Sequence, residues 1–404
     1  MTASAGNRPR RALIIVENLS CPFDRRVWLE ATTLARNGYA VSIICPKGAG
    51  YDRSFEVIDG IHIYRHWLPK EGAGALGYWL EYGVALACEA WLAIRIAFTR
   101  GFDVIHACNP PDLIFLVAWL FKPFGKRFVF DHHDVNPELY IAKFGRQDLF
   151  YRLILLAERM TFRSADISIA TNESYRRVAI ERGGMSPDRV FVVRSGPDLG
   201  RVQIRPPAPS WRNGRRYLVG YVGVMGKQEG LDLLLRSVSH IVTRRGRTDI
   251  QFVLVGGGTE LQALRLLCEE LELKEFVPFP GRLPDEALFD VLSTADVCVN
   301  PDPVNAMNDM STMNKIMEYM ALGRPIVQFE LTEGRYSAAE SSLYALPNDI
   351  EDFADKVIQL IDAADLRRTM GAAGQRRIRE ELSWEHEAPR LLDAYEAVFR
   401  SRNG

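Results

Sequence analysis

Short apolar segments alternate with amphipathic segments twice along this chain, and a proline-rich stretch separates the two series. The first series contains predicted strands at residues 11–17, 40–45, 103–107, 128–131, 167–170 and 190–193. The second contains predicted strands at residues 217–221, 251–255, 276–278, 297–300, 326–330 and 342–345. Strands that are separated by helices form parallel sheets covered by helices on both faces. The sequence therefore predicts two α/β domains of the Rossmann type.

The length and composition of the chain agree with this division. Its 404 residues exceed what one compact core usually contains, and its hydrophobic content of 47% is ordinary for a globular protein. The stretch at 205–210 has the composition of a linker. We therefore expect a first domain at 1–198, a linker at 199–216 and a second domain at 217–382. Residues 55–58 and 61–66 are expected to form a hairpin.

Charge and cysteine usage exclude several classes of protein. A formal net charge of −1 argues against a dedicated nucleic-acid binder. The six cysteines lack CxxC spacing, which predicts buried thiols in a reducing compartment and no zinc site. The apolar run at 12–16 is too short for the core of a signal peptide. We therefore expect a cytoplasmic protein.

The segment at 76–98 is an apolar helix with few charges. Glu81, Glu89, Arg95 and Arg100 fall within an arc of about 140° on a helical wheel. The two glutamates argue against a membrane-spanning helix. Two interpretations remain: a helix buried against the sheet, or an interfacial helix that rests on a membrane through Trp79, Leu80 and Trp91. A second apolar run at 113–121 is followed by basic residues at 122, 126 and 127, which favours membrane contact modestly.

A short helix is predicted just before the strand at 326–330. Ser311 or Thr312 is expected to cap its N-terminus, and Gly323 to end it. A helix N-terminus attracts anions, and Lys315 adds positive charge in the first turn. Glu318, on the same face, can accept two hydrogen bonds from a sugar diol. This pattern suits a nucleotide diphosphate, although a surface helix with an i, i+3 ion pair is the simpler alternative.

Three loops of the second series should converge on the same edge of the sheet. They contain Gly223 with Lys227, Gly256 within a run of three glycines, and Arg282 after a predicted strand. Glycines permit close backbone approach, and the two cations can meet phosphate. Neither series has a G-x-G-x-x-G after its first strand, which disfavours a dinucleotide domain. The convergence of the loops with the helix at Asn314 favours a nucleotide site.

In the first series, the segment Asp131-His132-His133-Asp134 follows directly on a strand. Polar residues at the carboxyl ends of parallel strands face the ligand crevice. A metal site is disfavoured because adjacent residues of an extended chain point in opposite directions. Structural hydrogen bonding is a second interpretation, and a histidine that contacts substrate from the interdomain cleft is the one we favour. His106, at the end of the preceding strand, should line the same crevice, and we assign it to acceptor binding.

The loop after the first strand contains a further group of polar residues. Cleft position and paired arginines favour anion or acceptor binding by four residues, Asn18, Asp24, Arg25 and Arg26. Local capping by one arginine, with the other solvated, is equally consistent with the sequence.

These segments together resemble the group 1 (family 4) retaining glycosyltransferases of the GT-B fold over nearly all of the chain. The matching segments are 220–230, 252–258, 277–282, 295–301 and 317–327, the last similar to the family's L-E-A-M-A-x-G-x-P-V. Residues 131–134 resemble the family's D-x-H-E, which maps its substrate-contacting histidine onto His133. Residues 195–198 resemble its N-G-V-D. The helix from 383 to 404 resembles the one that crosses back onto the first domain.

Three positions depart from the family pattern. The first of the family's two glutamates is Met310 here, its diphosphate-binding arginine is Val224, and the lysine that follows is Glu229. The lost positive charge must come from elsewhere, and Lys315 and Lys227 are the nearest candidates, with Arg282 or Arg335 behind them. The N-K-I-M-E-Y-M variant resembles a sub-branch found in O-antigen and exopolysaccharide assembly.

The resemblance implies two Rossmann-like domains that face each other across a cleft. It implies a metal-independent hexosyltransferase that moves a sugar from a nucleoside diphosphate donor, most simply a UDP-sugar, to a glycan or polyprenyl-linked acceptor, without a cofactor. His133, Lys315 and Glu318 would be the catalytic residues. Gly223, Lys227, Gly256, Arg282 and Asn314 would complete the donor site. The alternatives are a nucleotide-sugar epimerase of the same fold and a catalytically inactive partner subunit that binds nucleotide-sugar. The reaction would take place in the cytoplasm, with the inner face of the membrane as the alternative site.

Overall fold

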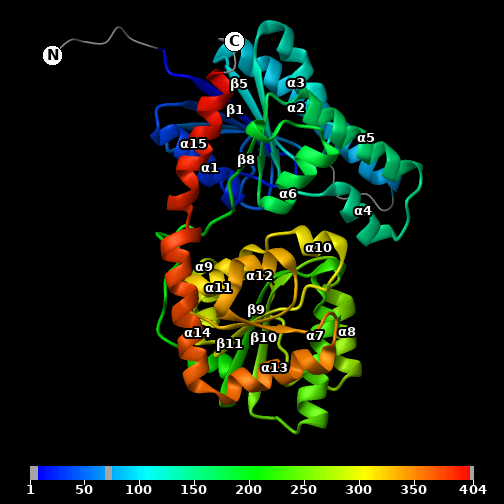
Figure 1. Cartoon of the computed structure of the whole chain (residues 1–404), viewed down its shortest axis with the longest axis vertical. Helices are drawn as coiled ribbons and strands as arrows, with labels where there is room; N and C mark the ends of the chain where they lie inside the picture. The colour runs from blue at the N-terminus through cyan, green and yellow to red at the C-terminus, as the bar shows by residue number, and fades with distance from the viewer. Residues whose placement is uncertain (1–7, 69–74, 401–404) are drawn as a thin grey trace, which may run out of the picture. The chain divides into compact units, whose positions relative to one another are not determined.

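The computed structural model describes residues 8–68 and 75–400, and side chains in the helix that begins at residue 75 are described from residue 83. The chain divides into two compact units (Figure 1). The first unit contains residues 1–141, 145–194 and 387–404, and the second contains 142–144 and 195–386. Both units are α/β, as the alternation of apolar and amphipathic segments predicts.

The first unit is built on an eight-stranded sheet with the order β3-β4-β2-β1-β5-β6-β7-β8. All neighbouring strands are parallel except β3 and β4. The strands are β1 (Arg11–Ile15), β2 (Ala40–Pro46), β3 (Phe55–Ile58), β4 (Ile61–His66), β5 (Val104–Cys108), β6 (Arg127–His132), β7 (Ile167–Ala170) and β8 (Val190–Val192). The principal helices are α1 (Arg25–Arg36), α2 (Ala75–Thr99), α3 (Phe115–Phe121), α4 (Asn136–Phe144), α5 (Leu149–Ser164), α6 (Glu173–Arg177) and α15 (Trp384–Arg400).

Local chemistry explains where these elements turn and begin. The predicted hairpin is present, and its turn residues Asp59 and Gly60 have φ values of 50° and 79°. Such positive values are those that a two-residue hairpin turn requires. Helix α1 begins after Asp24, whose carboxylate accepts a hydrogen bond from the Val27 amide at 3.1 Å.

The second unit contains a five-stranded parallel sheet with the order β10-β9-β11-β12-β13. Its strands are β9 (Tyr217–Val224), β10 (Ile250–Gly257), β11 (Val297–Asn300), β12 (Ile326–Phe329) and β13 (Ser342–Ala345). Its helices are α7 (Leu231–Ser239), α8 (Leu261–Glu270), α9 (Asp285–Thr294), α10 (Ala306–Met310), α11 (Asn314–Ala321), α12 (Thr332–Ala338), α13 (Ile350–Asp362) and α14 (Ala364–Arg377). A short 3₁₀ segment, η5 (Lys227–Glu229), lies between β9 and α7.

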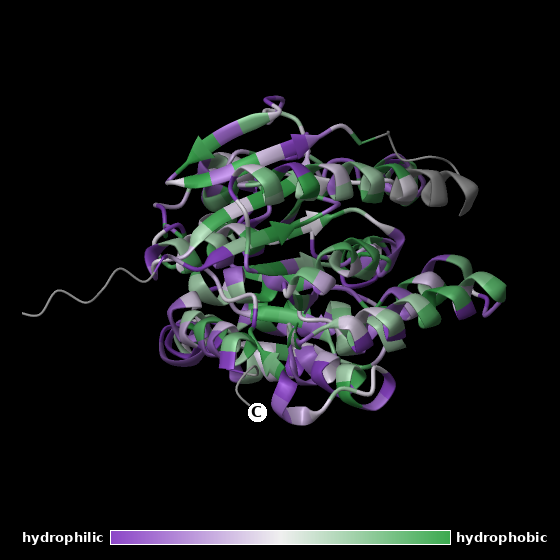
Figure 2. Ribbon diagram, turned by 90° about the horizontal axis from the view of Figure 1, so that it is seen from above, coloured by the Kyte–Doolittle hydropathy of each residue, from purple (hydrophilic) through white to green (hydrophobic). Residues whose placement is uncertain are grey.

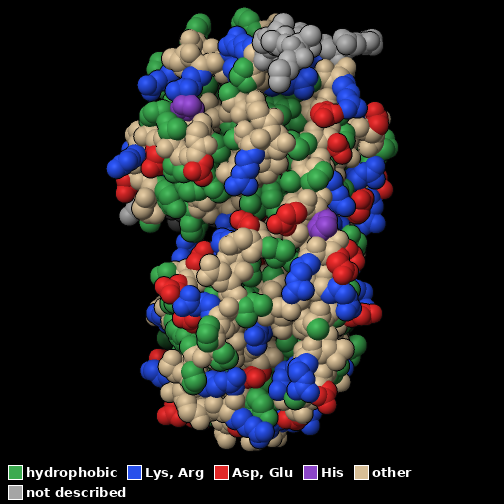
Figure 3. Space-filling view, turned by 90° about the vertical axis from the view of Figure 1, so that its left-hand side faces the viewer, with side chains coloured by type: hydrophobic (Ala, Val, Ile, Leu, Met, Phe, Trp, Pro, Cys, Tyr) green, Lys and Arg blue, Asp and Glu red, His purple; other side chains and the backbone are tan. Residues whose placement is uncertain are grey.

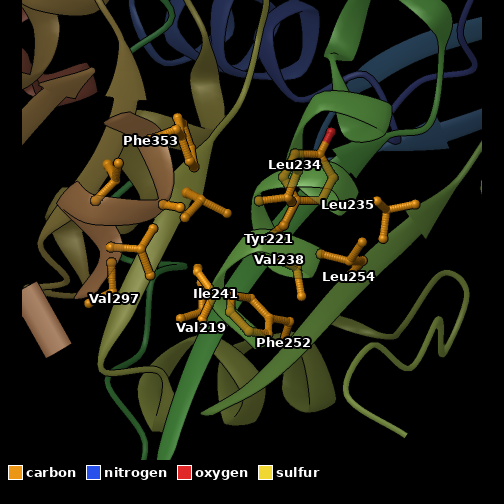
Figure 4. Packing of buried hydrophobic residues seen from close by; sticks show 14 of the residues in the cluster. Val219, Tyr221, Leu234, Leu235, Val238, Ile241, Phe252, Leu254, Val297 and Phe353 are labelled. Atoms are coloured by element: carbon orange, nitrogen blue, oxygen red, sulfur yellow. The ribbon is translucent and has the colours of Figure 1, made fainter. Parts of the chain in front are cut away.

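Successive residues of β9, β10, β11 and β12 belong to two separate hydrophobic clusters. Val219, Tyr221 and Phe252 pack with residues of α7 and α13 on one face, as Figure 4 shows. Leu218 and Val253 pack with residues of α9 and α11 on the other face. Because both faces of the sheet are covered, the strands are apolar throughout rather than alternating. This burial holds the carboxyl ends of the strands in a fixed arrangement.

Two expected elements differ in the structure. Residues 276–278 do not form a strand, although the Phe276 and Pro278 carbonyls accept hydrogen bonds from β10. Pro278 and Pro280 have no N–H groups, so this segment cannot complete a ladder. Helix α11 starts at Asn314, and its N-cap residue Met313 makes no side-chain capping bond. Neither predicted capping residue therefore occupies the cap position, because the separate helix α10 ends just before them.

Helix α2 is largely hydrophobic (Figure 2). Its face toward the sheet contains Ala85, Ala93 and Ile96, which are fully buried, and also Glu89. Glu89 is therefore buried on the side of α2 that faces the sheet, whereas Arg95 and Arg100 are exposed. No helix in the described residues is sufficiently long and apolar to cross a bilayer. Trp79 and Leu80 lie outside the described side chains.

Candidate functional site

The carboxyl edge of the second sheet brings Lys315 into a buried ion pair. Its Nζ lies 2.6 Å from Oε2 of Glu229 and 3.0 Å from Oδ1 of Asp302. The same ammonium lies 5.0 Å from the centre of the Tyr221 ring. The Tyr221 hydroxyl donates to the Val224 carbonyl at 3.0 Å and lies 3.2 Å from Glu229 Oε2. Lys315 therefore neutralises protein carboxylates in this structure.

Burial sets the protonation of this cluster. Burial raises the pKa of Asp302 to about 7, although the Lys315 ammonium opposes the shift. Burial alone would lower the pKa of Lys315, but the Asp302 and Glu229 carboxylates hold it well above its usual range. Lys315 is thus a permanent cation, and the charge of the cluster changes as Asp302 titrates near neutral pH.

Glu318, the predicted sugar-diol acceptor, is held by an arginine from the linker. Arg201 Nη2 donates to Glu318 Oε1 at 2.8 Å, and Nη1 of the same guanidinium lies 2.7 Å from Asp285 Oδ2. The Glu318 side chain is 14% exposed. The Glu318 carboxylate is therefore oriented by Arg201 and partly open to solvent, and a carboxylate can accept several hydrogen bonds.

The predicted glycines form a tight contact between two loops. Gly256 has φ +142°, and a Cβ there would lie 1.8 Å from the Gly223 carbonyl oxygen. A Cβ at Gly258 would lie 2.5 Å from the Met225 oxygen. These glycines are required for the packing of β9 and β10 at their carboxyl ends. They shape the edge of the sheet at which the predicted donor site lies.

Two predicted cations remain at this edge without an internal partner. Lys227 and Arg282 are exposed, and in the described part of the chain neither makes a side-chain hydrogen bond or ion pair. Arg282 lies over Gly257, since a Cβ there would be 3.8 Å from its Cγ. Asn314 is exposed at the first position of α11. Arg335 is instead paired with Glu330 at 2.7 Å.

The first unit contains a buried charge network around Asp131. Arg26 Nη2 lies 2.9 Å from Asp131 Oδ1, and the Nε2 atom of His133 lies 2.5 Å from Asp131 Oδ2. Arg26 Nε lies 2.9 Å from the same His133 nitrogen. That nitrogen cannot donate to Asp131 and accept from Arg26 at once, and the shorter contact indicates donation to the carboxylate. Although burial alone would raise the pKa of Asp131, Arg26 and His133 hold it well below its usual range.

His133 combines this support with access to solvent. Its side chain is 16% exposed, and its backbone amide donates to Asn109 Oδ1 at 2.7 Å. His132 points into the core instead, with its ring centre 4.9 Å from that of Tyr175, and burial lowers its pKa to about 3. Strand alternation predicts that the two histidines diverge, and the structure determines that His133 is the accessible one.

Several residues that the sequence assigns to acceptor binding have internal roles. Asp24 caps α1, and Arg26 is buried against Asp131. His106 is fully buried, with Nδ1 2.9 Å from the Tyr395 hydroxyl and Nε2 3.3 Å from Asp131. These three side chains are therefore not available to an acceptor as expected, because the core uses their hydrogen-bonding groups. Asn18 and Arg25 are exposed.

Two sets of described side chains have the spacing of metal ligands. They are His106 with Cys108 and Asp131, and Glu30 with Asp131 and His133. Both sets include Asp131, whose charge the Arg26 guanidinium already compensates. A guanidinium at this distance repels a second cation, so the geometry favours an internal salt bridge.

Sequence reasoning did not identify Arg201, Asp302 or Tyr221 as members of the second-unit cluster. Asp302 closely follows β11 at the carboxyl edge of the sheet, and this position in the sequence could have indicated that it belongs to the site. Arg201 lies in the linker, and no local pattern indicates that it reaches Glu318.

Solved structures of other proteins share this two-unit architecture. Sucrose-phosphate synthase from Thermosynechococcus elongatus matches with a TM-score of 0.76 at 18% identity, covering 97% of this chain and all of that one. HepE from Anabaena, in complex with UDP and glucose, matches with a TM-score of 0.72 at 14% identity, covering 96% of this chain and 100% of that one. These matches identify the GT-B fold.

Sequence comparison gives the family. The family described as Glycosyltransferase Family 4 matches residues 24–201, and that described as Glycosyl transferases group 1 matches residues 216–363. D-inositol 3-phosphate glycosyltransferase of Corynebacterium jeikeium is 27% identical over 258 residues, or 60% of each chain. The chain thus matches about three fifths of that relative's length. An uncharacterised glycosyltransferase of Methanocaldococcus jannaschii is 21% identical over 91% of this chain and 92% of its own. The two family matches together span most of the chain, which therefore belongs to the group 1, family 4 glycosyltransferases of the GT-B fold.

Proposed function

We propose that this protein transfers a hexosyl group from a nucleoside diphosphate sugar to a glycan acceptor, with retention of anomeric configuration. The observation that carries the proposal is the arrangement at the carboxyl edge of the second sheet. A fixed and partly accessible Glu318 lies one turn beyond the α11 N-terminus, at the edge that also presents two unpaired cations, Lys227 and Arg282. A diol acceptor beside positive charge suits a ribose and its diphosphate.

In this proposal the diphosphate is bound by side chains other than those the family pattern uses. Glu229 and Val224 stand at the usual cationic positions, and Lys315 is engaged by Glu229 and Asp302. Lys227 and Arg282 are available, so we assign leaving-group stabilisation to them. The leaving diphosphate gains charge as the glycosidic bond breaks, and preorganised cations stabilise that charge. Lys315 acts as a positioning residue that holds Glu229 and Asp302.

The resemblance to the family assigns His133 to the donor sugar. The hydrogen bond that His133 Nε2 donates to Asp131 fixes the orientation of the imidazole. The opposite edge of the ring would then contact the ligand. Asp131 would stabilise positive charge near an oxocarbenium-like transition state. Protein cations would offset the diphosphate, so the proposal requires neither a metal ion nor a cofactor.

We propose UDP as the nucleotide, because a protein of the same fold, HepE, binds UDP. A relative from Corynebacterium glutamicum is named as GDP-mannose-dependent, which makes GDP the competing base. The proposed acceptor is a polyprenyl-linked glycan in surface polysaccharide assembly. The reaction would then take place in the cytoplasm, at the inner face of the membrane.

Thermal shift against UDP, GDP, ADP and dTDP tests the donor site. The wild type should be stabilised by one nucleotide, and the shift should be lost in Glu318→Ala and reduced in the double variant Lys227→Ala/Arg282→Ala. Arg335→Ala is the control, because its guanidinium is paired with Glu330. If no nucleotide stabilises the wild type, the inactive partner-subunit alternative replaces the proposal. Release of free sugar without any acceptor would instead indicate the epimerase.

A further inference from the structure

Three helices of the first unit expose an unusual number of large apolar side chains. Phe98 is 88% exposed, Phe124 75% and Leu149 68%, although each belongs to or adjoins a helix that also contributes to the core. The exposed apolar residues of this group are Trp91, Ile94 and Phe98 of α2, Leu116, Trp119 and Leu120 of α3, Phe124 just after α3, and Leu149, Phe150, Leu153 and Leu156 of α5. We call this group the apolar face.

The three helices form one continuous surface. Helix α3 packs against both α2 and α5, and Figure 1 shows the three next to one another. The Trp119 indole donates a hydrogen bond to the Ser164 hydroxyl of α5 at 2.8 Å, which holds α3 to α5. On α5, Leu149, Leu153 and Leu156 recur at helical spacing and therefore share one side of that helix. An exposed apolar group of this size on one unit marks an interaction site.

The charges on these helices are distributed asymmetrically. The acidic residues in α5 and in the described part of α2, Glu158 and Glu89, are fully buried. The exposed charged side chains beside the apolar face are instead arginines, namely Arg95, Arg152, Arg159 and Arg163. On the face of the molecule drawn in Figure 3, by contrast, acidic and basic side chains are interspersed. Among the described side chains, the charges that border the apolar face are therefore mainly positive, and the partly exposed Asp148 beside Leu149 is paired with Arg146.

From this pattern we propose that the apolar face docks on an anionic lipid bilayer. Tryptophan, phenylalanine and leucine flanked by arginine are the composition of helices that lie in a membrane interface. Phosphate headgroups complement the arginine border, whereas a protein partner would also need an acidic surface of matching shape. No described helix is long and apolar enough to cross the bilayer, so contact would be through helix faces. The inference rests on the proposed location at the membrane, and vesicle binding tests it separately from donor binding because vesicle binding requires no turnover.

The experiment is sedimentation of the full chain with vesicles of phosphatidylcholine, with and without phosphatidylglycerol. The wild type should bind the anionic vesicles, and high salt should weaken binding. The variant Trp91→Ser/Phe98→Ser/Leu153→Ser should bind at least about tenfold more weakly, because it removes apolar side chains from the interface. Arg95→Gln/Arg152→Gln/Arg159→Gln should lose the preference for phosphatidylglycerol.

The matched control is Leu266→Ser/Leu346→Ser, which removes two exposed leucines from the second unit and should leave binding unchanged. Circular dichroism and the nucleotide-induced thermal shift establish that each variant is folded. Wild type that binds neither vesicle, or equal binding by wild type and the apolar-face variant, would overturn the proposal. So would a concentration-dependent dimer that the serine variant abolishes without any vesicle binding, since the face would then bind a second copy.

Discussion

Lys315 and Glu229 form an ion pair with a 2.6 Å separation, and both side chains are largely buried, at 10% and 15% exposure. In this chain Glu229 stands where the family pattern has a lysine. Lys315 of α11 therefore supplies the positive charge in this region, and Glu229 of η5 supplies the negative charge. The two charges are paired with each other, whereas the family pattern would direct positive charge to a ligand.

Removing one member of this pair should destabilise the protein strongly. Lys315→Met leaves Glu229 and Asp302 buried without their cation, and we expect a loss of about 3–5 kcal/mol in the free energy of unfolding. Urea unfolding measures this loss. Lys274→Met is the control, because its pair with Glu269 is exposed, and its effect should stay below about 1 kcal/mol. Equal effects of the two substitutions would contradict the assignment.

Glu318 should bind the donor, and Arg201 should orient it. Glu318→Ala is expected to weaken nucleotide binding by about 1–3 kcal/mol, the usual cost of losing hydrogen bonds to a charged group. Arg201→Ala should have a smaller effect of the same sign, measured by calorimetry. Arg205→Ala provides a matched control in the same linker, since Arg205 pairs with Glu286 and Asp290. Nucleotide binding that is unaffected by Glu318→Ala would remove this residue from the site.

Substitutions of His133 and of Asp131 should affect activity and stability differently. His133→Ala should lower kcat by about 100-fold with little change in Tm, because the ring is partly exposed and contributes electrostatic stabilisation. Asp131→Ala should lower Tm as well, since it leaves the buried Arg26 guanidinium without its principal partner. A His133 variant with normal kcat and raised KM would assign the residue to ground-state binding instead.

The contact between Gly256 and Gly223 should tolerate no side chain. Gly256→Ala places a Cβ 1.8 Å from the Gly223 oxygen at a φ of +142°, and we expect a loss of about 3 kcal/mol or more. Gly257→Ala is the adjacent control, because a Cβ there meets only Arg282, at 3.8 Å. Thermal unfolding of the two variants should differ clearly, and similar values would show that the loops can move apart.

Stability should fall as the pH rises toward 7. Burial, with the Glu158 carboxylate nearby, raises the pKa of Asp112 to about 7 from an ordinary value near 4. The folded protein therefore binds a proton that the unfolded chain releases, and its stabilising contribution is complete below about pH 4 and lost as the pH passes about 7. Asp112→Asn should reduce this slope in urea unfolding measured from pH 5 to 8. An unchanged slope would assign the pH dependence to other buried acids such as Asp302.

Most of the secondary structure could be predicted because its signals are local. The hairpin at Asp59-Gly60, the cap at Asp24 and the end of α11 at Gly323 each depend on a few consecutive residues. The failures were local as well: residues 276–278 have a strand-like composition, but prolines remove the amides that a ladder needs.

The alternation of apolar and amphipathic segments determined two parallel-sheet units and placed the candidate loops at the carboxyl edges of their strands. Only the tertiary structure decided which charges at those edges face a ligand. Lys315 meets Glu229 across 86 positions of sequence, Arg26 meets Asp131 across 105, and Arg201 meets Glu318 across 117. A long side chain selects its partner among groups that only folding brings together, so its pairing cannot be read from neighbouring residues. The sequence thus supplied the charged groups, and the packing of the strands and helices determined which of them are neutralised internally.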